Sequence, residues 1–290
     1  MNLSAAESFN YQTIEVKPLI GALGAEIHGV DISKSLNTQC IGEIRRVWLD
    51  YHVVVFRDQT LNPQQQKDFA RCFGELDTYP FVKPLDDHPE VIPIIKEPDN
   101  KVNFGGGWHT DTSYQETPPM ATMLYAVDVP DVGGDTLFAN MVLAYQKLSP
   151  GMRRIVDGLY GIFGSEKVHG SEGIYKNADH AMEKQQNPDW LKIQVTHPIA
   201  RTHPETGRKN LYVSLPHMLK LKDMRKDDSE LLMKYLGDFI VKPEFTTRVH
   251  WRKGTLVMWD NRCVQHYALN DYAGKRREMH RVTLKGDKPF

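Results

Sequence analysis

The chain has 290 residues, enough for one large domain or two small ones with a sizeable buried core. Its apolar and charged fractions, 40% and 25%, are ordinary for a soluble globular protein, and a net charge of −1 excludes an overall field favouring nucleic acid or an acidic membrane. No run approaches the roughly 20 apolar residues of a membrane span. Residues 1–12 lack the basic and apolar regions of a signal peptide.

The cysteines indicate the redox environment. Cys40, Cys72 and Cys263 are far apart and form no CxxC pair. An odd, sparse set of this kind favours reduced thiols and therefore a cytoplasmic protein.

The first half of the chain mixes short β-branched runs with amphipathic segments. Residues 52–59, HVVVFRDQ, are typical of a buried strand. Asn62 and Pro63 have the residue types of a helix cap and a first helical position, and Gly74 is a suitable end. In order we predict two strands within 13–31, a helix over 36–50, a strand over 52–59, a helix from Pro63 to Gly74 and a strand over 90–97.

The second half is richer in strands. We predict strands over 120–129 and 133–140, two helices within 141–158 that are separated at Ser149 and Pro150, strands over 193–201 and 210–214, a helix over 229–240, and four further strands from 244 to the C-terminus. Between them, residues 164–188 are polar and lack periodicity, which predicts a lid or an insertion around 164–190, although a tolerated surface insertion is an equal alternative.

The most informative stretch is GGGWHTDTSYQETPP, residues 105–119. His109 and Asp111 are two residues apart, so in an extended chain their side chains point to the same side. With one more histidine they would form the two-histidine, one-carboxylate set of non-haem Fe(II) oxygenases. Two other pairs, His88 with Glu90 and His203 with Glu205, contain proline and are predicted to lie in surface loops.

Several motifs in the same order carry a family resemblance: IGALGAEIHGVDIS, VVVFRDQTLNPQQQKDFARCFGEL, WHTDTSYQETPP, VPDVGGDTLFAN and the C-terminal stretch 259–290. Together they resemble the taurine dioxygenase-like (TauD/TfdA) family of Fe(II)/2-oxoglutarate-dependent dioxygenases. The resemblance implies a double-stranded β-helix, or jelly roll, with helices on the outside. This agrees with the α+β, β-rich class that the strand pattern indicates, in a single domain of residues 1–290.

The resemblance also implies the reactive residues. His109, Asp111 and His266 would bind Fe(II), and three protein ligands would leave positions for 2-oxoglutarate and O2. Such an enzyme hydroxylates a C–H bond of its substrate and releases succinate and CO2.

Two further positions match the anchors of 2-oxoglutarate in the family, Thr136 and Arg277. Arginine supplies the planar, charged fork that the remote carboxylate requires. The neighbouring Arg276 should instead point to solvent. Along the last strand Arg281 shares a face with Arg277, and in the family its position meets the anionic group of the substrate. A structural ion pair is the alternative role for Arg281.

Two positions differ from taurine-specific members, which place a histidine after FGEL and an asparagine before WHTD. Here Tyr79 and Gly105 occupy those places. A partner for the amine of taurine is therefore missing, whereas Arg281 for an anion is retained. We expect a different small organic anion as the partner, an alkylsulfonate, a sulfate ester or an aryloxyalkanoate. His169 could also contact it, but a solvated loop histidine is the simpler expectation.

Two alternatives use the same residues differently. Two histidines and an aspartate also suit a catalytic zinc of a hydrolase, and a β-barrel could bind a small acid without catalysis. A hydrolase would not need Thr136 and Arg277, and the intact ligand set together with the two arginines, Arg277 and Arg281, argues against a non-catalytic protein. Trp108 and Trp259 flank those ligands and are predicted to pack around a dry cavity. A homo-oligomer is plausible from the family alone.

Overall fold

The computed structural model describes residues 9–79, 82–170, 173 and 193–290. Its largest sheet has the strand order β1-β2-β3-β14-β6-β16-β4, and β5 also pairs with β16. All of these pairings are antiparallel except β2 with β3. The strands are β1 (Glu15–Pro18), β2 (Ala25–His28), β3 (Val53–Phe56), β4 (Leu76–Asp77), β5 (Ile92–Lys96), β6 (Ala121–Asp128), β14 (Leu256–Asp260) and β16 (Arg277–Leu284).

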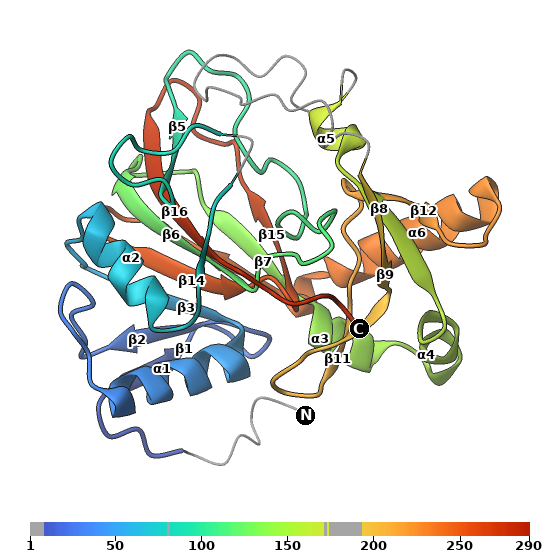
Figure 1. The fold of residues 1–290 in the computed structure, drawn as a ribbon, viewed down its shortest axis with the longest axis horizontal. Coiled ribbons are helices and arrows are strands. Elements are labelled where there is room, and N and C mark those ends of the chain that lie inside the picture. Colours follow the sequence, from blue (N-terminus) through green and yellow to red (C-terminus); the bar gives the residue numbers. More distant parts are fainter. Residues whose placement is uncertain (1–8, 80–81, 171–172, 174–192) are drawn as a thin grey trace.

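A second, three-stranded sheet has the order β13-β7-β15. Its strands are β7 (Thr136–Asn140), β13 (Thr246–Val249) and β15 (Val264–Ala268). Hydrophobic side chains from both sheets, such as Val257 on β14 and Phe138 on β7, belong to one buried cluster. Two antiparallel sheets joined by a common interior form the predicted double-stranded β-helix, and Figure 1 shows both with helices outside them.

Strand alternation determines which residues face this interior. On β16, Val282 and Leu284 pack outward against helices, whereas Met279 belongs to the cluster between the sheets. Arg277 and Arg281, at even spacing from Met279, lie on its side of the sheet and are buried. The last strand therefore carries two arginines into the space between the sheets.

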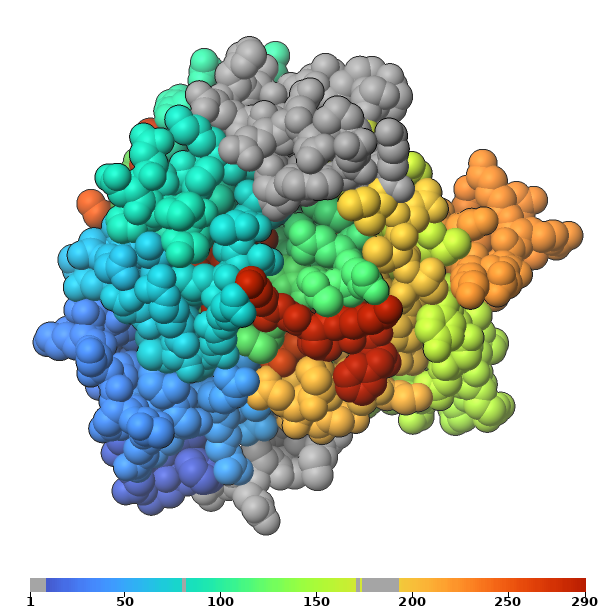
Figure 2. Space-filling model, viewed as in Figure 1, coloured from blue at the N-terminus to red at the C-terminus, as the bar shows by residue number. Residues whose placement is uncertain are grey.

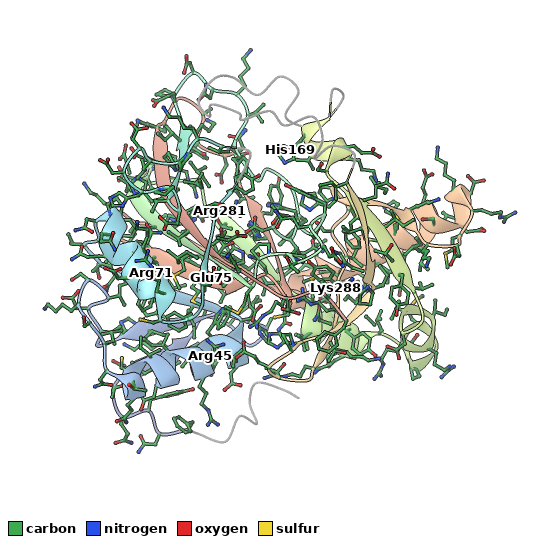
Figure 3. The ribbon with its side chains drawn as sticks, viewed as in Figure 1. Arg45, Arg71, Glu75, His169, Arg281 and Lys288 are labelled. Carbon is green, nitrogen blue, oxygen red and sulfur yellow. The ribbon has the colours of Figure 1, made fainter. Side chains whose placement is uncertain are left out.

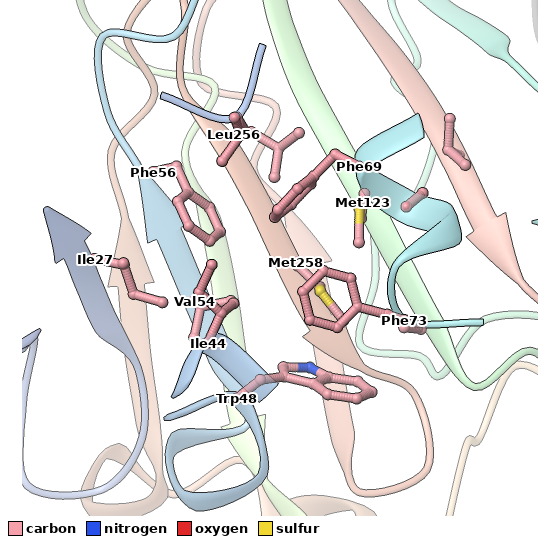
Figure 4. Close-up of a cluster of buried hydrophobic side chains, with 14 of the residues drawn as sticks. Ile27, Ile44, Trp48, Val54, Phe56, Phe69, Phe73, Met123, Leu256 and Met258 are labelled. Carbon is pink, nitrogen blue, oxygen red and sulfur yellow. The ribbon is translucent and has the colours of Figure 1, made fainter. Parts of the chain in front are cut away.

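Two helices cover the outer face of the large sheet, α1 (Thr38–Tyr51) and α2 (Pro63–Arg71). Figure 4 shows their side chains Trp48, Ile44 and Phe69 packed against strand residues such as Val54 and Met258. Each helix is capped by an asparagine, and Asn62 with Gln65 forms a full capping box before Pro63. Burial of this apolar face fixes the sheet to its helical layer.

Most of the remaining elements contribute side chains to a third hydrophobic cluster beside the second sheet. The remaining elements are α3 (Met141–Lys147), α4 (Pro150–Val156), β8 (Tyr160–Gly164), α5 (Glu166–His169), β9 (Gln194–Pro198), β10 (Ala200–Thr202), β11 (Lys209–Leu211), β12 (Met218–Leu221), α6 (Lys226–Ile240) and the 3-10 helix η3 (Pro243–Phe245). Within the described residues, no helix is both long and apolar enough to cross a membrane.

The elements differ from the sequence-based predictions mainly at their ends. The helix after Asn62 ends at Arg71 rather than at Gly74, because the last three residues form a turn. The strand predicted over 210–214 is only Lys209–Leu211, and the helix predicted from 229 begins at Lys226. The break at Ser149 and Pro150 is confirmed. Strand β12 was not predicted.

Most of the predicted lid around 164–190 lies outside the described residues. Its described beginning is not irregular, because Glu166–His169 form the short helix α5, followed by Gly170. Val168 is buried in this turn and His169 is half-buried, whereas Glu166 and Lys167 are exposed, so one side of the turn packs inward.

Candidate active site

The three predicted metal ligands meet at one point. His109 and His266 form an isolated antiparallel bridge, with each backbone N–H donating to the other residue's carbonyl at 3.0 and 2.9 Å. The segment WHTD thus extends the second sheet next to β15. Nε2 of His109 and Nε2 of His266 each lie 3.8 Å from Oδ1 of Asp111. Three such atoms on one side of a common centre form the facial set expected for Fe(II).

The contacts and the burial of the two imidazoles are compatible with metal binding. Nδ1 of His109 lies 2.7 Å from the carbonyl oxygen of Gly107, which accepts only if Nδ1 carries the proton. The lone pair is then on Nε2, the atom that faces Asp111. Burial lowers the pKa of both His109 and His266, so both rings are neutral and able to bind a cation.

Asp111 is held as a carboxylate by its neighbours. Burial by itself would raise its pKa, but Arg281 in particular, together with a hydrogen bond from Thr122, holds the pKa of Asp111 well below its usual range. Nη2 of Arg281 lies 3.2 Å from Oδ1, and Oγ1 of Thr122 lies 2.6 Å from Oδ2. The residue after it, Thr112, has φ of 38°, an uncommon value for a β-branched residue.

One cavity extends from the metal ligands toward Arg277, and we call it the inner cavity. It lies between the two sheets. Its walls are formed by Ile94, Phe104, Gly105, His109, Asp111, Leu124, Thr136, Trp259, His266, Ala268, Arg277 and Arg281. The predicted cradle for 2-oxoglutarate and the predicted metal ligands therefore line a single space.

Arg277 has unused donors in this cavity. It is 6% exposed, and its Nε and Nη2 have no hydrogen-bond partner among the residues that the structure describes. Its guanidinium carbon lies 5.7 Å from the ring centre of Trp251, whose indole nitrogen donates to Oγ1 of Thr136 at 2.9 Å. Burial lowers the pKa of Arg277, yet arginine keeps its charge under ordinary conditions. Two adjacent free donors match the two oxygens of a carboxylate.

A second cavity opens on the other side of the ligands, and we call it the outer cavity. It shares His109, Asp111, Gly105, Phe104 and Arg281 with the inner one. Its remaining lining residues are Tyr79, Gly106, Gly107, Thr112, Tyr114, Val168, His169, Pro216 and His217. In Figure 3, Arg281 lies in the interior of the fold, and His169 lies further out beside α5.

The predicted substrate residues meet in the outer cavity. The guanidinium of Arg281 is 4% exposed and lies 5.0 Å from the ring centre of Tyr79. Gly105 has φ of 78°, and a side-chain carbon added there would lie 3.2 Å from Cε1 of His109. Glycine therefore allows both this backbone conformation and the close approach to the ligand. The contact of Arg281 with Asp111 also gives it a structural role.

Sequence reasoning missed two residues of this cavity, Tyr114 and His217. Burial lowers the pKa of His217 to about 3, so its ring is neutral, and the ring lies edge-on to Tyr114 at 4.8 Å between ring centres. His217 comes from a segment without a recognisable motif, SLPH, which gave no signal. His169 was predicted to be a solvated loop residue; in the structure it is half-buried and lines the cavity.

One prediction about the other His-Pro-Glu pairs is wrong. His203 does follow β10 in a turn, but its side chain is 1% exposed and its Nε2 lies 3.0 Å from Oδ2 of Asp260. The polar sequence around it indicated the turn correctly but could not show that a fully hydrogen-bonded histidine can point inward. His88 and Glu90 do lie in a loop, and Glu90 pairs with Lys67.

The residues beside the predicted ligands have the expected surroundings. Arg276 lies away from both cavities and pairs with Glu97, Asp128 and Glu278 at the surface, so it is half-exposed but not simply solvated. Trp108 packs against Tyr267 at 5.8 Å between ring centres. Trp259 lines the inner cavity.

Comparisons with known proteins agree with this geometry. The family described as "Taurine catabolism dioxygenase TauD, TfdA family" matches residues 15–283. The chain belongs to this family.

Its relatives cover nearly the whole chain. It is 33% identical to the alpha-ketoglutarate-dependent sulfate ester dioxygenase of Pseudomonas putida, over 99% of this chain and 95% of that protein. It is 32% identical to an alkylsulfatase of Acinetobacter baylyi, over 95% and 86%. It is also 32% identical to the alpha-ketoglutarate-dependent 2,4-dichlorophenoxyacetate dioxygenase of Cupriavidus pinatubonensis, over 95% and 99%.

Solved structures show the same fold. The crystal structure of a taurine dioxygenase from Burkholderia xenovorans superimposes with a TM-score of 0.81 at 36% identity, covering 96% of this chain and 91% of that one. AAD-2 in complex with Mn(II) and N-oxalylglycine superimposes with a TM-score of 0.78 at 27% identity, covering 96% and 99%. The predicted family, jelly-roll fold and dioxygenase class are confirmed, and neither the zinc hydrolase nor the non-catalytic alternative is supported.

Proposed function

We propose that this protein uses Fe(II), 2-oxoglutarate and O2 to hydroxylate a C–H bond of a small organic anion, with release of succinate and CO2. When bound, Fe(II) and 2-oxoglutarate supply the activation of O2 and the oxidative decarboxylation. Two of the relatives are named as alpha-ketoglutarate-dependent dioxygenases, one of a sulfate ester and one of 2,4-dichlorophenoxyacetate, and a third is named an alkylsulfatase. These names support a small organic anion as the substrate.

The observation that carries the proposal is the state of Arg277. A buried guanidinium with two unsatisfied donors is costly unless a ligand fills them. The remote carboxylate of 2-oxoglutarate would accept from Nε and Nη2 together, and Thr136 would add a hydroxyl. A zinc hydrolase has no use for this cradle between the sheets and beside the metal ligands.

The metal ligands fit Fe(II) by their chemistry. His109 and His266 are neutral, Asp111 is ionised, and their donor atoms lie within 4.8 Å of one another. Imidazole and carboxylate together suit a divalent iron and leave one side of it open toward the two cavities. We assign His109, Asp111 and His266 as its ligands.

Arg281 would orient the substrate. Among the described lining residues, Arg281 is the arginine that borders both cavities, whereas Arg277 borders the inner one, and Tyr79 lies against the guanidinium of Arg281. An anionic group held there would leave the remainder of the substrate among Phe104, Tyr114 and Pro216. The hydrophobic contacts of the substrate, together with its fixed anionic group, would direct one C–H bond toward the proposed metal ligands.

The outer cavity disfavours taurine. Among its described lining residues, Asp111 is the only carboxylate, and it already faces the imidazoles and Arg281. An ammonium group would be buried here without a partner, which is costly. Gly105 adds no side chain for it. An uncharged alkyl or aryl tail suits the aromatic walls better, so a sulfate ester, an alkylsulfonate or an aryloxyalkanoate remains the proposed class.

The test is coupled turnover. Purified enzyme with Fe(II), 2-oxoglutarate and O2 would be incubated with an alkyl sulfate, an alkylsulfonate, an aryloxyacetate and taurine. For an alkyl sulfate, hydroxylation at the carbon that bears the ester oxygen gives a hemiacetal ester, which breaks to an aldehyde and sulfate. We expect product and succinate in equal amounts with one of the first three anions. Taurine turnover that matches the best of them would contradict the substrate class.

Three further points belong to the proposal. We infer that residues 1–290 act as a single domain, with a lid or an insertion around 164–190. The described beginning of this segment is α5, whose His169 lines the outer cavity. We also infer a cytoplasmic location from the three free cysteines, and a possible homo-oligomer from the family. Cell fractionation and size-exclusion chromatography with light scattering test the last two.

A further inference from the structure

A chain of buried hydrogen bonds runs behind Asp111, on the side away from Arg281. The indole Nε1 of Trp259 donates to Oδ1 of Asn261 at 2.9 Å, and Nδ2 of Asn261 donates to Oγ1 of Thr122 at 2.9 Å. Oγ1 of Thr122 then donates to Oδ2 of Asp111 at 2.6 Å. All four side chains are at most 3% exposed, so water does not compete for these bonds.

The direction of this chain is fixed at Trp259. An indole N–H can only donate, so the atom of Asn261 that faces it is the amide oxygen. The amide nitrogen must therefore face Thr122 and donate to its hydroxyl. A hydroxyl has one proton, and with Asn261 as donor that proton is directed at Asp111.

The consequence is that the two oxygens of Asp111 have different roles. Oδ2 accepts the proton of Thr122, whereas Oδ1 faces Nε2 of His109 and of His266 at 3.8 Å each. Rotation of the carboxylate that brought both oxygens toward a metal would break the short bond to Thr122. Trp259 also packs on the ring of His266, 4.7 Å between centres. The same side chain therefore contacts His266 directly and is linked to Asp111 through the hydrogen-bond chain.

We propose that Thr122 and Asn261 are positioning residues that keep Asp111 a one-oxygen ligand of the metal and thereby leave open the positions that 2-oxoglutarate and O2 require. This inference rests on the proposed function. Neither residue lines the inner or the outer cavity, so both would act through Asp111.

The experiment compares two size-matched substitutions of threonine by valine with one variant that keeps the hydroxyl. Thr122→Val removes the hydroxyl, Thr122→Ser retains it, and Thr283→Val is the control. Thr283 is buried directly opposite Thr122 in the pairing of β16 with β6 and takes no part in the hydrogen-bond chain. Anaerobic titration with Co(II) as a spectroscopic substitute would give the metal Kd and the visible absorption that reports coordination number. Thermal unfolding without metal would report the fold.

We expect Thr122→Val to raise the Co(II) Kd about tenfold or more and to change the absorption, since losing the partner of a ligating carboxylate costs about 10–100-fold in affinity. Thr122→Ser and Thr283→Val should keep the wild-type Kd and spectrum. A wild-type Kd and spectrum for Thr122→Val, or an equal change in Thr283→Val, would overturn the inference.

Two outcomes are kept separate by the design. If the wild type itself binds no Co(II) or Fe(II), the proposed function fails. If the wild type binds the metal and Thr122→Val binds it equally well, only the positioning role fails. If Thr122→Val does not fold, Trp259→Phe decides, because it removes the donor that fixes the direction of the chain. A weaker Co(II) affinity with an altered spectrum then supports the inference, and wild-type behaviour overturns it.

Discussion

Two buried clusters among the described residues combine histidine, aspartate and a third side chain able to bind a metal. In the first, His109, Asp111 and His266 direct their donor atoms at a common point. In the second, both oxygens of Asp260 are already bonded to Arg262, with Oδ1 to Nε at 2.8 Å and Oδ2 to Nη2 at 2.7 Å.

The difference between the clusters lies in what remains free. In the second cluster, Nδ1 of His203 accepts from two backbone N–H groups, so Nε2 carries the proton and donates to Asp260. Burial raises the pKa of the Cys263 thiol well above its usual value, which keeps it protonated. Residue types alone therefore do not define a metal site. A metal also requires donor atoms whose lone pairs are not already used by other groups.

The largest effect is expected from removing a ligand in the first cluster. His266→Ala should abolish Fe(II) binding and lower 2-oxoglutarate-dependent succinate formation by a factor of about a thousand or more, since two ligands cannot hold the metal in an open site. Bound iron and succinate are measured after anaerobic reconstitution. His203→Asn, in the second cluster, should keep the wild-type iron content. Equal loss of iron from both variants would remove the distinction.

The second cluster should respond in stability instead. Asp260→Ala removes the buried partner that holds Arg262 through two hydrogen bonds and leaves it Glu205, and should lower the free energy of unfolding by about 3–5 kcal/mol. Asp260→Ala combined with Arg262→Met removes both charges and should recover part of that loss. Denaturant unfolding checks both variants. A destabilisation that the double variant does not relieve would mean that packing, not charge, dominates here.

A smaller change is expected when the guanidinium of Arg277 in the inner cavity is replaced. Arg277→Lys keeps the charge but loses a bidentate contact, and should raise the Kd for 2-oxoglutarate about 10–100-fold without changing Fe(II) affinity. Equilibrium binding under anaerobic conditions measures both. Arg276→Lys, in the surface ion cluster, is the matched control and should behave as wild type.

The smallest effect concerns the pH dependence of stability, through a histidine that contacts the second cluster. Burial lowers the pKa of His52 to about 3, and its Nδ1 lies 3.4 Å from Sγ of Cys263. The unfolded chain binds this proton below about pH 6.5, whereas the folded one does not, so stability is complete above that pH and is lost as pH falls toward 3.

The corresponding variant is His52→Asn, which suits the left-handed backbone at this position, φ 65°. It should flatten the loss of unfolding free energy between about pH 6 and 4 by up to about 1.4 kcal/mol per pH unit. Urea unfolding across this range measures the slope. An unchanged slope would assign the acid sensitivity to other buried histidines such as His197.

Much of the fold could be predicted because its signals are local. Alternation along the last strand placed Arg277, Met279 and Arg281 on one face, and the asparagine and proline at 62–63 marked a helix start that the structure confirms. What the sequence could not indicate are contacts set by packing between distant segments. His217 reaches the outer cavity from a segment with no motif, and His203 points inward from a polar turn.

The site loop shows the same limit. Its residues 105–119 were identifiable by composition, and the C-terminal stretch 259–290 was recognised as a motif, yet the contacts of the end of that stretch with the loop were not predicted. Lys288 pairs with Glu116 at 2.9 Å, and the backbone N–H of Met120 donates to Leu284. Figure 2 shows this last segment, in red, beside the green region that contains the loop. Such support depends on pairing across more than 160 residues, for which no local pattern exists.

The most direct test of the account is the anaerobic visible spectrum of the purified protein with Fe(II) and 2-oxoglutarate. We predict a weak charge-transfer band from a 2-oxo acid bound through two oxygens to a three-ligand iron, lost in His266→Ala and retained in His203→Asn. Addition of a suitable organic anion should shift it. Stoichiometric iron without any such band in the wild type would contradict the central claim, and a band that persists in His266→Ala would show that the third ligand is assigned wrongly.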